Sequence, residues 1–360
     1  MGDWYFWYRL SPRPAVEPYG TLSSYFNAVL YTGTSSGNST TFPADRWSFY
    51  ESTESSNRFF VDGQTLGYGV SVNGVEVTGQ RTLPLYVRNT ELQSPAAAAG
   101  VQRGDRVVSI NGRSASDIIA ANDLATVLTP SAAGQALTLV LQRTGVNRTV
   151  VLTAAVFNLT PVPLDSVVTT PGGHKLGYVV VKDMISQAET PLAAAFARFR
   201  AAGVEAVVLD LRYNGGGLVS VGNAVASYLA GSRGSGRVYA SLLYNDLRAG
   251  SNNTSVRFSN PAAALGAARV YVLTGPRTCS ASEQVINGLR GVGVEVVSVG
   301  DTTCGKPVGF LPASSCGTTF SIVNFESVND RNEGRYFDGF AATCPVVEDF
   351  TQALGSSNEP

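Results

Sequence analysis

Apolar runs separated by glycine-rich turns dominate the second half of the chain. The run at 206–211, Ala-Val-Val-Leu-Asp-Leu, is apolar on both faces, as in a strand buried inside a sheet. Further strands are expected at 175–181, 270–273 and 294–299, and helices at 188–202, 219–229 and 282–289. Because strands alternate with helices, the pattern favours an α/β fold with a mostly parallel sheet and helices packed on it.

The region before this core has a different pattern. Aromatic segments and a short amphipathic stretch around 25–31 predict a small helical N-terminal unit. The next hundred residues are richer in alternating strand patterns and turn signals, which predicts a β-rich domain. We therefore divide the chain into an N-terminal segment at 1–57, the β-rich domain at 58–157, the α/β core at 158–350 and a flexible tail at 351–360.

The composition excludes several classes of protein. Hydrophobic residues make up 44% of the chain and charged residues 15%, as in a globular protein. A net charge of −1 gives no electrostatic footprint for nucleic acid, and no apolar stretch reaches the roughly 20 residues of a membrane span. The aromatic start at 4–7 lacks the basic and apolar regions of a signal peptide, although removal of an export signal is compatible with the remaining sequence.

The four cysteines all lie in the last quarter of the chain. With one histidine and no Cys-x-x-Cys pair, we expect neither a metal site nor a cofactor. An even, clustered set predicts two disulfides, and hence an exported protein in the periplasm or cell envelope. Cys304 and Cys316 flank an expected hairpin and would pair, which leaves Cys279 with Cys344. The alternative is four buried free thiols in a cytoplasmic enzyme.

Candidate chemistry centres on Ser280 and Lys306. Ser280 follows an apolar run at the turn into an expected helix, where its hydroxyl could be exposed and the Ala281 amide could face a developing oxyanion. The alternative is that Ser280 only caps the helix and has no catalytic role. His174 is the only histidine and lies in a glycine turn, so the base of a serine hydrolase would more naturally be a lysine. The chain has three lysines, and Lys306 is followed by apolar residues that could dry its surroundings.

A glycine loop follows the buried strand at 206–211. Its three consecutive glycines include Gly216 and Gly217, and they permit a sharp turn that presents backbone amides. Such amides could bind phosphate, but no Gly-Lys-Ser/Thr follows, which disfavours a P-loop. They could equally form an oxyanion hole.

The β-rich domain resembles a PDZ domain of the bacterial protease type. The resemblance rests on Ser-Pro-Ala-x-x-Ala-Gly-Val at 94–101, followed by Gly-Asp-x-Val-x-x-Ile-Asn-Gly at 104–112. It implies that a polypeptide carboxy-terminus is captured by strand addition, with its carboxylate on the backbone amides of Leu66, Gly67, Tyr68 and Gly69. The alternative for those glycines is an ordinary hairpin turn.

The core motifs resemble the carboxy-terminal processing, or tail-specific, serine peptidase family. These motifs are Leu-Asp-Leu-Arg-x-Asn-x-Gly-Gly, Ser-Ala-Ser-Glu and Gly-Asp-x-Thr-x-Gly-Lys, in the family's order. The resemblance covers residues 58–350 and implies a crotonase/ClpP-like protease core. It makes Ser280 the nucleophile, Lys306 the general base, and Gly216, Gly217 and Ala281 the oxyanion-hole residues, with Gly216 versus Gly217 left open. It also implies an endopeptidase that cleaves polypeptides near their carboxy-termini.

The chain departs from the family pattern at one position. Many members carry a glutamine four residues after the lysine, which orients the amine, whereas this chain has Phe310. A base must be substantially neutral, so the pKa of Lys306 has to fall by roughly 3 units from its ordinary value. Phe310 leaves open an alternative function, a non-catalytic peptide- or ligand-binding protein. A third alternative is an esterase using the same dyad.

Overall fold

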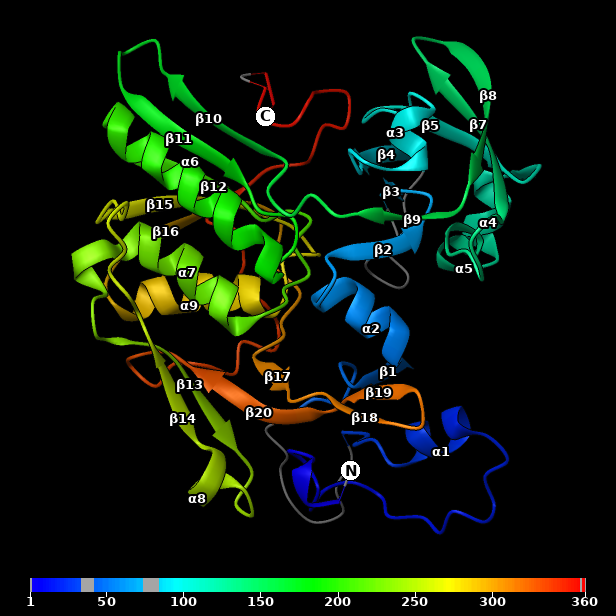
Figure 1. Cartoon of the computed structure of the whole chain (residues 1–360), viewed down its shortest axis with the longest axis horizontal. Coiled ribbons are helices and arrows are strands. Elements are labelled where there is room, and N and C mark those ends of the chain that lie inside the picture. The colour runs from blue at the N-terminus through cyan, green and yellow to red at the C-terminus, as the bar shows by residue number, and fades with distance from the viewer. Residues whose placement is uncertain (1, 34–41, 74–83, 357, 360) are drawn as a thin grey trace.

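The computed structural model describes residues 2–33, 42–73, 84–356 and 358–359. Figure 1 shows an α/β core, a β-rich domain beside it, and an N-terminal segment that runs along the base of both.

The N-terminal segment packs its aromatic side chains onto the core. Tyr5, Trp7 and Trp47 are buried together with Val308 and Val323, which belong to two strands of the core. The Tyr5 hydroxyl donates to the buried carboxylate of Asp45 at 2.6 Å. The segment contains η1 (Gly2–Trp4), α1 (Leu22–Ala28), β1 (Phe49–Ser52) and α2 (Thr53–Phe60). It is therefore more than a helical unit, because β1 pairs antiparallel with a strand of the core.

The β-rich domain is a five-stranded antiparallel path with small helices at its edges. The strand order is β3-β4-β5-β7-β8, β6 pairs with β5, and β2 pairs separately with β9. Leucine and valine side chains on the inner face of these strands are almost completely buried. The elements are β2 (Gln64–Gly67), β3 (Val70–Val72), β4 (Leu85–Thr90), α3 (Pro95–Ala98), β5 (Arg106–Ile110), β6 (Arg113–Ser114), α4 (Ala115–Ala120), α5 (Leu124–Leu128), β7 (Ala136–Arg143), β8 (Val146–Thr153) and β9 (Ala155–Asn158).

A six-stranded sheet forms one side of the core. Its order is β10-β11-β12-β15-β16-β21, and every pairing except β10 with β11 is parallel. These strands are β10 (Leu164–Thr169), β11 (Lys175–Val180), β12 (Ala206–Asp210), β15 (Arg269–Thr274), β16 (Glu295–Gly300) and β21 (Cys344–Pro345). The helices of the core are η2 (Ser186–Ala188), α6 (Glu189–Ala202), α7 (Val219–Ala230), η3 (Gly231–Arg233), α8 (Ala249–Asn252) and α9 (Ala281–Gly291).

The rest of the core is antiparallel, which corrects the expectation of a mostly parallel sheet. A four-stranded sheet has the order β14-β13-β20-β17, and a three-stranded sheet the order β1-β19-β18. These strands are β13 (Val238–Tyr244), β14 (Thr254–Arg257), β17 (Val308–Phe310), β18 (Ala313–Ser315), β19 (Thr318–Ser321) and β20 (Val323–Val328). Among the described strands, parallel pairing is thus confined to the six-stranded sheet, and the strands of the other two core sheets pair antiparallel.

Helices α7 and α9 lie between the six-stranded and four-stranded sheets (Figure 1). Helix α9 is accordingly buried along almost its entire length, with Arg290 as its one partly exposed residue. A helix covered on every side has little freedom to shift. The residue at its N-terminus, Ser280, is therefore held on a rigid support.

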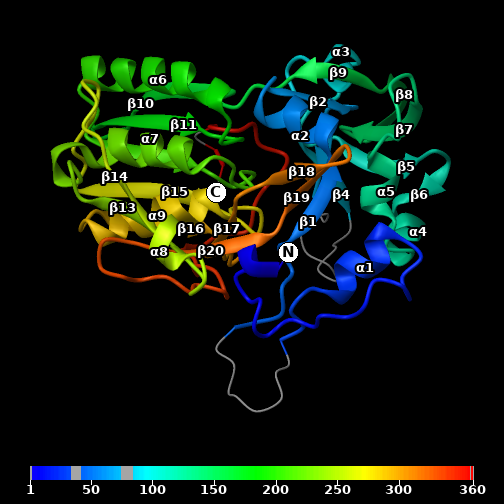
Figure 2. The same ribbon diagram turned by 60° about the horizontal axis from the view of Figure 1, so that its bottom comes forward.

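The C-terminal segment lies between the core and the β-rich domain (Figure 1). Arg103 of the β-rich domain binds the Glu348 carboxylate at 2.9 Å, and its Nε donates to the Gln352 carbonyl at 2.7 Å. Phe350 stacks on Tyr86 with the ring centroids 6.0 Å apart. In Figure 2, the β-rich domain and the core lie side by side, with the N-terminal segment crossing below them.

The packing of α6 on β11 gives a test of the fold. Phe199 is fully buried, and its ring lies 2.8 Å from the place where a Cβ would stand on Gly177. Phe199→Ala should therefore lower the free energy of unfolding by about 3–5 kcal/mol, since the cavity cannot be refilled by the glycine opposite. Urea denaturation measures this loss. Val347→Ala, at an exposed position, should change stability by no more than about 0.5 kcal/mol.

Candidate active site

Ser280 stands at the N-terminus of α9 in an unusual backbone conformation. Its φ is 56° and its ψ is −118°, a region that residues with a side chain rarely occupy. Such a conformation costs of order 1–3 kcal/mol and persists only where the surroundings impose it. Here Thr278 helps to impose it, because its hydroxyl donates to the Leu211 carbonyl at 2.8 Å and accepts from the Gly275 amide at 3.0 Å. The serine side chain is half-buried.

The glycine loop after β12 lies against this serine. A Cβ on Gly216, whose φ is 102°, would stand 2.7 Å from the Ser280 Cβ, so only glycine fits there. Asn214 is fully buried and fixes the loop. Its side-chain nitrogen donates to the Val181 carbonyl at 2.8 Å, and its backbone carbonyl accepts from the Cys279 amide at 3.1 Å. The loop and the serine turn are thus held as one unit.

The amides near Ser280 are not equivalent. The Gly216 amide donates to the Asn214 side-chain oxygen at 2.8 Å and is therefore occupied. The amides of Gly217 and Ala281 have no hydrogen-bond acceptor among the residues that the structure describes. Of the two glycines that the sequence left open, Gly217 is thus the one with an available donor.

Lys306 lies in the loop between β16 and β17. Burial lowers the pKa of Lys306 from 10.5 to about 8, and the negative charges of Glu283 and Asp45 oppose this decrease. The two residues that follow, Pro307 and Val308, are buried, as the sequence indicated. The ammonium group lies 3.9 Å from the centre of the Phe310 ring. Lys306 is thus the kind of lysine that can lose its proton at mildly alkaline pH.

Glu283 joins the serine turn to the lysine loop, a role that our sequence reasoning missed. Its side chain is fully buried and its carboxylate accepts from the backbone amides of Ser280 at 3.0 Å, Gly305 at 2.8 Å and Lys306 at 2.8 Å. The Thr303 hydroxyl also donates to it at 2.6 Å. Burial raises the pKa of this carboxyl, while the donated hydrogen bonds lower it. The sequence did carry a signal, because a glutamate three residues after a serine at a helix start is typical of a capping box.

A disulfide gives a second, covalent link between the same two loops. Cys279 is bonded to Cys304 with their Cα atoms 5.2 Å apart, and Cys316 and Cys344 are exposed free thiols. The expected pairs, Cys304 with Cys316 and Cys279 with Cys344, are therefore wrong. The reason is local: the Cys304 amide donates to the Thr278 carbonyl at 3.0 Å, which places Cys304 beside Cys279. Cys316 instead occupies the turn between β18 and β19.

Asp210 and Arg212 form an ion pair at the base of the glycine loop. The Arg212 guanidinium binds the Asp210 carboxylate at 2.6 Å, and the Tyr178 hydroxyl donates to the same carboxylate at 2.8 Å. Arg212 also binds Glu359 at 2.9 Å. This ion-paired cluster anchors the base of the glycine loop and connects it to the C-terminal segment.

The expected carboxylate-binding residues lie in the β-rich domain, separate from Ser280. Leu66 and Gly67 end β2, and Tyr68 and Gly69 follow as a turn. A Cβ on Gly69, whose φ is 78°, would stand 2.1 Å from the Ser94 hydroxyl oxygen, so the turn requires glycine. The amides of Tyr68 and Gly69 have no hydrogen-bond acceptor in the described part of the chain.

Two family models match the chain in the places where this geometry is found. Residues 175–314 match peptidase family S41, and residues 86–143 match the PDZ domain. The chain thus has one region similar to peptidase family S41 and another similar to a PDZ domain. The first match includes the glycine loop, Ser280 and Lys306, and the second covers β4 to β7 of the β-rich domain.

Curated relatives carry names that fit this combination. The chain is 28% identical over 215 residues to the carboxyl-terminal-processing protease of Picosynechococcus, covering 59% of this chain and 48% of that protein. It is 25% identical over 270 residues to the carboxy-terminal processing protease CtpB of Bacillus subtilis. That match covers 73% of this chain and 51% of the Bacillus protein. The chain thus spans about half the length of these relatives.

Solved structures share the fold. An S41 protease from Bacteroides fragilis superposes with a TM-score of 0.73 at 24% identity, covering 99% of this chain and 92% of that one. The photosystem II D1 C-terminal processing protease superposes with a TM-score of 0.53 at 22% identity, covering 84% and 78%. No helix among the described residues is both long enough and apolar enough to cross a membrane.

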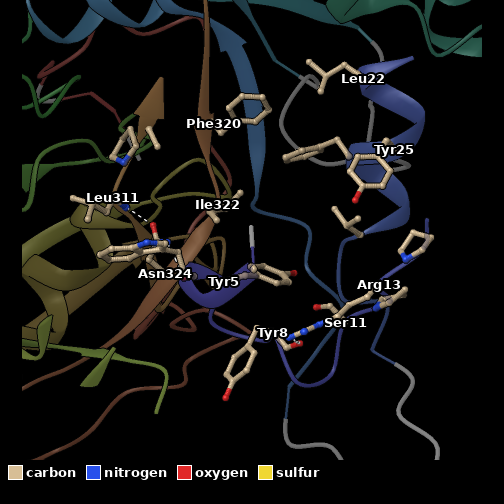
Figure 3. A pocket seen from close by; sticks show the side chains of 18 residues that line it. Tyr5, Tyr8, Ser11, Arg13, Leu22, Tyr25, Leu311, Phe320, Ile322 and Asn324 are labelled. Atoms are coloured by element: carbon tan, nitrogen blue, oxygen red, sulfur yellow. Dashed lines mark hydrogen bonds between the residues drawn. The ribbon is translucent and has the colours of Figure 1, made fainter. Parts of the chain in front are cut away.

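A separate cavity of about 780 Å³ lies between α1 and the strands β18 to β20 (Figure 3). Its walls carry aromatic side chains from the N-terminal segment, among them Tyr5, Tyr8 and Tyr25, and also Phe320 and Ile322 from the strand side. Neither Ser280 nor Lys306 lines this cavity.

The disulfide can be tested against its neighbours. Cys304→Ser should lower the free energy of unfolding by about 2–4 kcal/mol, since it releases a closed loop of 25 residues. It should also reduce activity, because one of the two links between the serine turn and the lysine loop is lost. Thermal unfolding with and without a thiol reductant measures the first effect. Cys316→Ser, at an exposed free thiol, is the matched control. Reaction of four thiols in the unreduced, denatured protein would contradict the pairing.

Proposed function

We propose that this chain is a serine endopeptidase in which Ser280 is the nucleophile and Lys306 the general base. The observation that carries the proposal is the joint support of these residues: one buried carboxylate, Glu283, binds the backbone of both. The strained backbone of Ser280 and the lowered pKa of Lys306 are typical of an activated nucleophile and its base. The names of the curated relatives agree with this reaction.

We propose that these groups act in the following order. The Lys306 amine accepts the hydroxyl proton of Ser280 as its oxygen attacks the carbonyl carbon of a peptide bond. The amides of Gly217 and Ala281 then donate to the negatively charged oxygen of the tetrahedral intermediate. The Lys306 ammonium returns the proton to the departing amine, which leaves an ester on Ser280. Water, deprotonated by the same amine, hydrolyses this ester and restores the serine.

We infer that the PDZ domain presents the substrate. The turn at 66–69 offers the amides of Tyr68 and Gly69 to a terminal carboxylate, and β3 offers a strand edge for pairing with an extended tail. Substrates would therefore be polypeptides with a free carboxy-terminus, cleaved near that end. The disulfide beside Ser280 favours action in an oxidising compartment outside the cytoplasm.

The dyad is tested by removing each partner. Ser280→Ala and Lys306→Ala should each lower kcat on an unstructured peptide at least about 1000-fold, because neither attack nor proton transfer has a substitute nearby. Lys306→Arg should not restore activity, since a guanidinium cannot act as a base at neutral pH. Lys175→Ala, at an exposed lysine, is the control.

These variants also separate the alternatives. Full proteolysis by Ser280→Ala or Lys306→Ala would overturn the dyad. Tight binding of peptides without turnover by the unaltered protein would instead support the non-catalytic binding protein, and turnover of esters but not amides the esterase.

The pKa of Lys306 predicts the pH dependence. Because the neutral amine is the active form, kcat/KM should rise with pH and reach half its plateau near pH 8. The free energy of unfolding should depend on pH in the same direction. Unfolding restores the ordinary lysine pKa of 10.5, so below about pH 8, where the buried lysine is charged, the fold is destabilised. Stability should therefore rise between pH 8 and 10.5, and Lys306→Met should be more stable than the unaltered protein at pH 7. A flat activity profile across this range would contradict the assignment.

A further inference from the structure

An aromatic ring lies beside the amine of Lys306. Its nitrogen lies 3.9 Å from the centre of the Phe310 ring. Lys306 donates its backbone amide to Glu283 at 2.8 Å, but its Nζ makes no hydrogen bond or ion pair to the residues that the structure describes. The Phe310 ring thus contacts the amine, at the position where the sequence lacks an orienting amide.

The Phe310 ring packs against a second aromatic ring, that of Phe49. The Phe49 ring meets it edge to face, with the centroids 5.6 Å apart and the planes at 81°, a favoured geometry for an aromatic pair. Phe49 is 41% exposed, so burial in the core does not by itself explain an aromatic residue there.

Sheet register explains how these two rings meet. Phe49 on β1 pairs with Ser321, and Phe310 on β17 pairs with Val323. Ser321 and Val323 are two residues apart on the chain that continues from β19 into β20. Both rings are thus placed by one continuous stretch of backbone, which joins the three-stranded sheet to the four-stranded sheet.

We propose that Phe310, supported by Phe49, positions the Lys306 amine toward Ser280 by contact with its aromatic face. The inference rests on the dyad proposed above. A ring excludes water from the amine and attracts the ammonium form through its face, yet it accepts no strong hydrogen bond. The lone pair of the neutral amine therefore remains available for the Ser280 proton. By this assignment, a strand of the N-terminal segment belongs to the machinery that holds the base.

Other titratable groups lie near the lysine or its loop. Glu283 on α9 and Asp45 before β1 raise its pKa through their negative charges. Arg46 donates to the Cys304 carbonyl at 3.2 Å, and the buried Tyr336 lies close enough to Glu283 for that carboxylate to raise its pKa. Substitutions at Phe310 leave all four groups unchanged, so a change in the lysine titration can be attributed to the ring.

The test compares three replacements of Phe310. Phe310→Leu retains an apolar side chain but has no ring face, so kcat should fall about tenfold with KM nearly unchanged, and the acidic midpoint of kcat/KM should fall by about half a unit to one unit. Phe310→Ala admits water, so its midpoint should rise. Phe310→Tyr keeps the ring and should keep both the rate and the midpoint. A residue that mattered only for folding would not move the midpoint in opposite directions.

A second readout needs no activity. In the Ser280→Ala protein labelled with ¹³C at the lysine Cε, the chain's three lysines give few signals, and Lys306→Met identifies the one that belongs to the base. Phe310→Leu should lower the titration midpoint of that signal, and Phe49→Leu should lower it by less. Leu311→Ala, next to Phe310 but half-exposed, is the control and should leave it unchanged.

The outcomes distinguish this inference from the proposed dyad. If Lys306→Ala is inactive while Phe310→Leu has the unaltered rate and lysine titration, the dyad stands and the role of Phe310 is wrong. If Lys306→Ala is fully active, the dyad itself is wrong. Thermal unfolding of each Phe310 variant checks that it is folded.

Discussion

The buried carboxylate of Glu283 is the contact on which the site depends. Its two oxygens accept three backbone amides and one hydroxyl, and these donors belong to the turn of Ser280 and the loop of Lys306. A buried carboxylate without these donors would be strongly destabilising. The two loops therefore stabilise the charge, and the charge in turn fixes the distance between the loops. The disulfide between Cys279 and Cys304 reinforces the same connection covalently.

The charge of Glu283 also opposes the deprotonation of Lys306. Its negative charge raises the pKa of Lys306, whereas a base must be largely neutral. The donated hydrogen bonds stabilise the negative charge of the Glu283 carboxylate. The ring of Phe310 places apolar surface beside the Lys306 amine. Burial outweighs the attraction, because the pKa of Lys306 falls to about 8 despite the nearby carboxylate. The arrangement thus uses one charge to hold the loops, while the lysine can still lose its proton at mildly alkaline pH.

The sequence predicted the features that local pattern determines. Buried parallel strands such as 206–210 have a two-sided apolar run, and chemistry-bearing loops follow their carboxyl ends, so Ser280 and the glycine loop could be found without coordinates. The antiparallel sheet around β20 could not, because its register depends on residues far apart in the chain. The predicted disulfide pairing was wrong for the same reason, because spacing along the chain does not show that Cys304 lies beside Thr278. The role of Glu283 also depends on a loop that is 20 residues away.

The N-terminal segment shows why a domain boundary predicted from amino-acid composition can differ from the boundary that packing contacts define. Its aromatic residues suggested a separate small unit, yet Tyr5 and Trp47 complete a cluster with Val308 and Val323, on the strands next to Lys306. Asp45 in this segment accepts the Tyr5 hydroxyl and also acts on the lysine through its charge. Removing the segment would therefore expose the apolar side of β17 and change the electrostatics of the base together. The surroundings of Lys306 are built from both ends of the chain, and its pKa is a property of the whole fold.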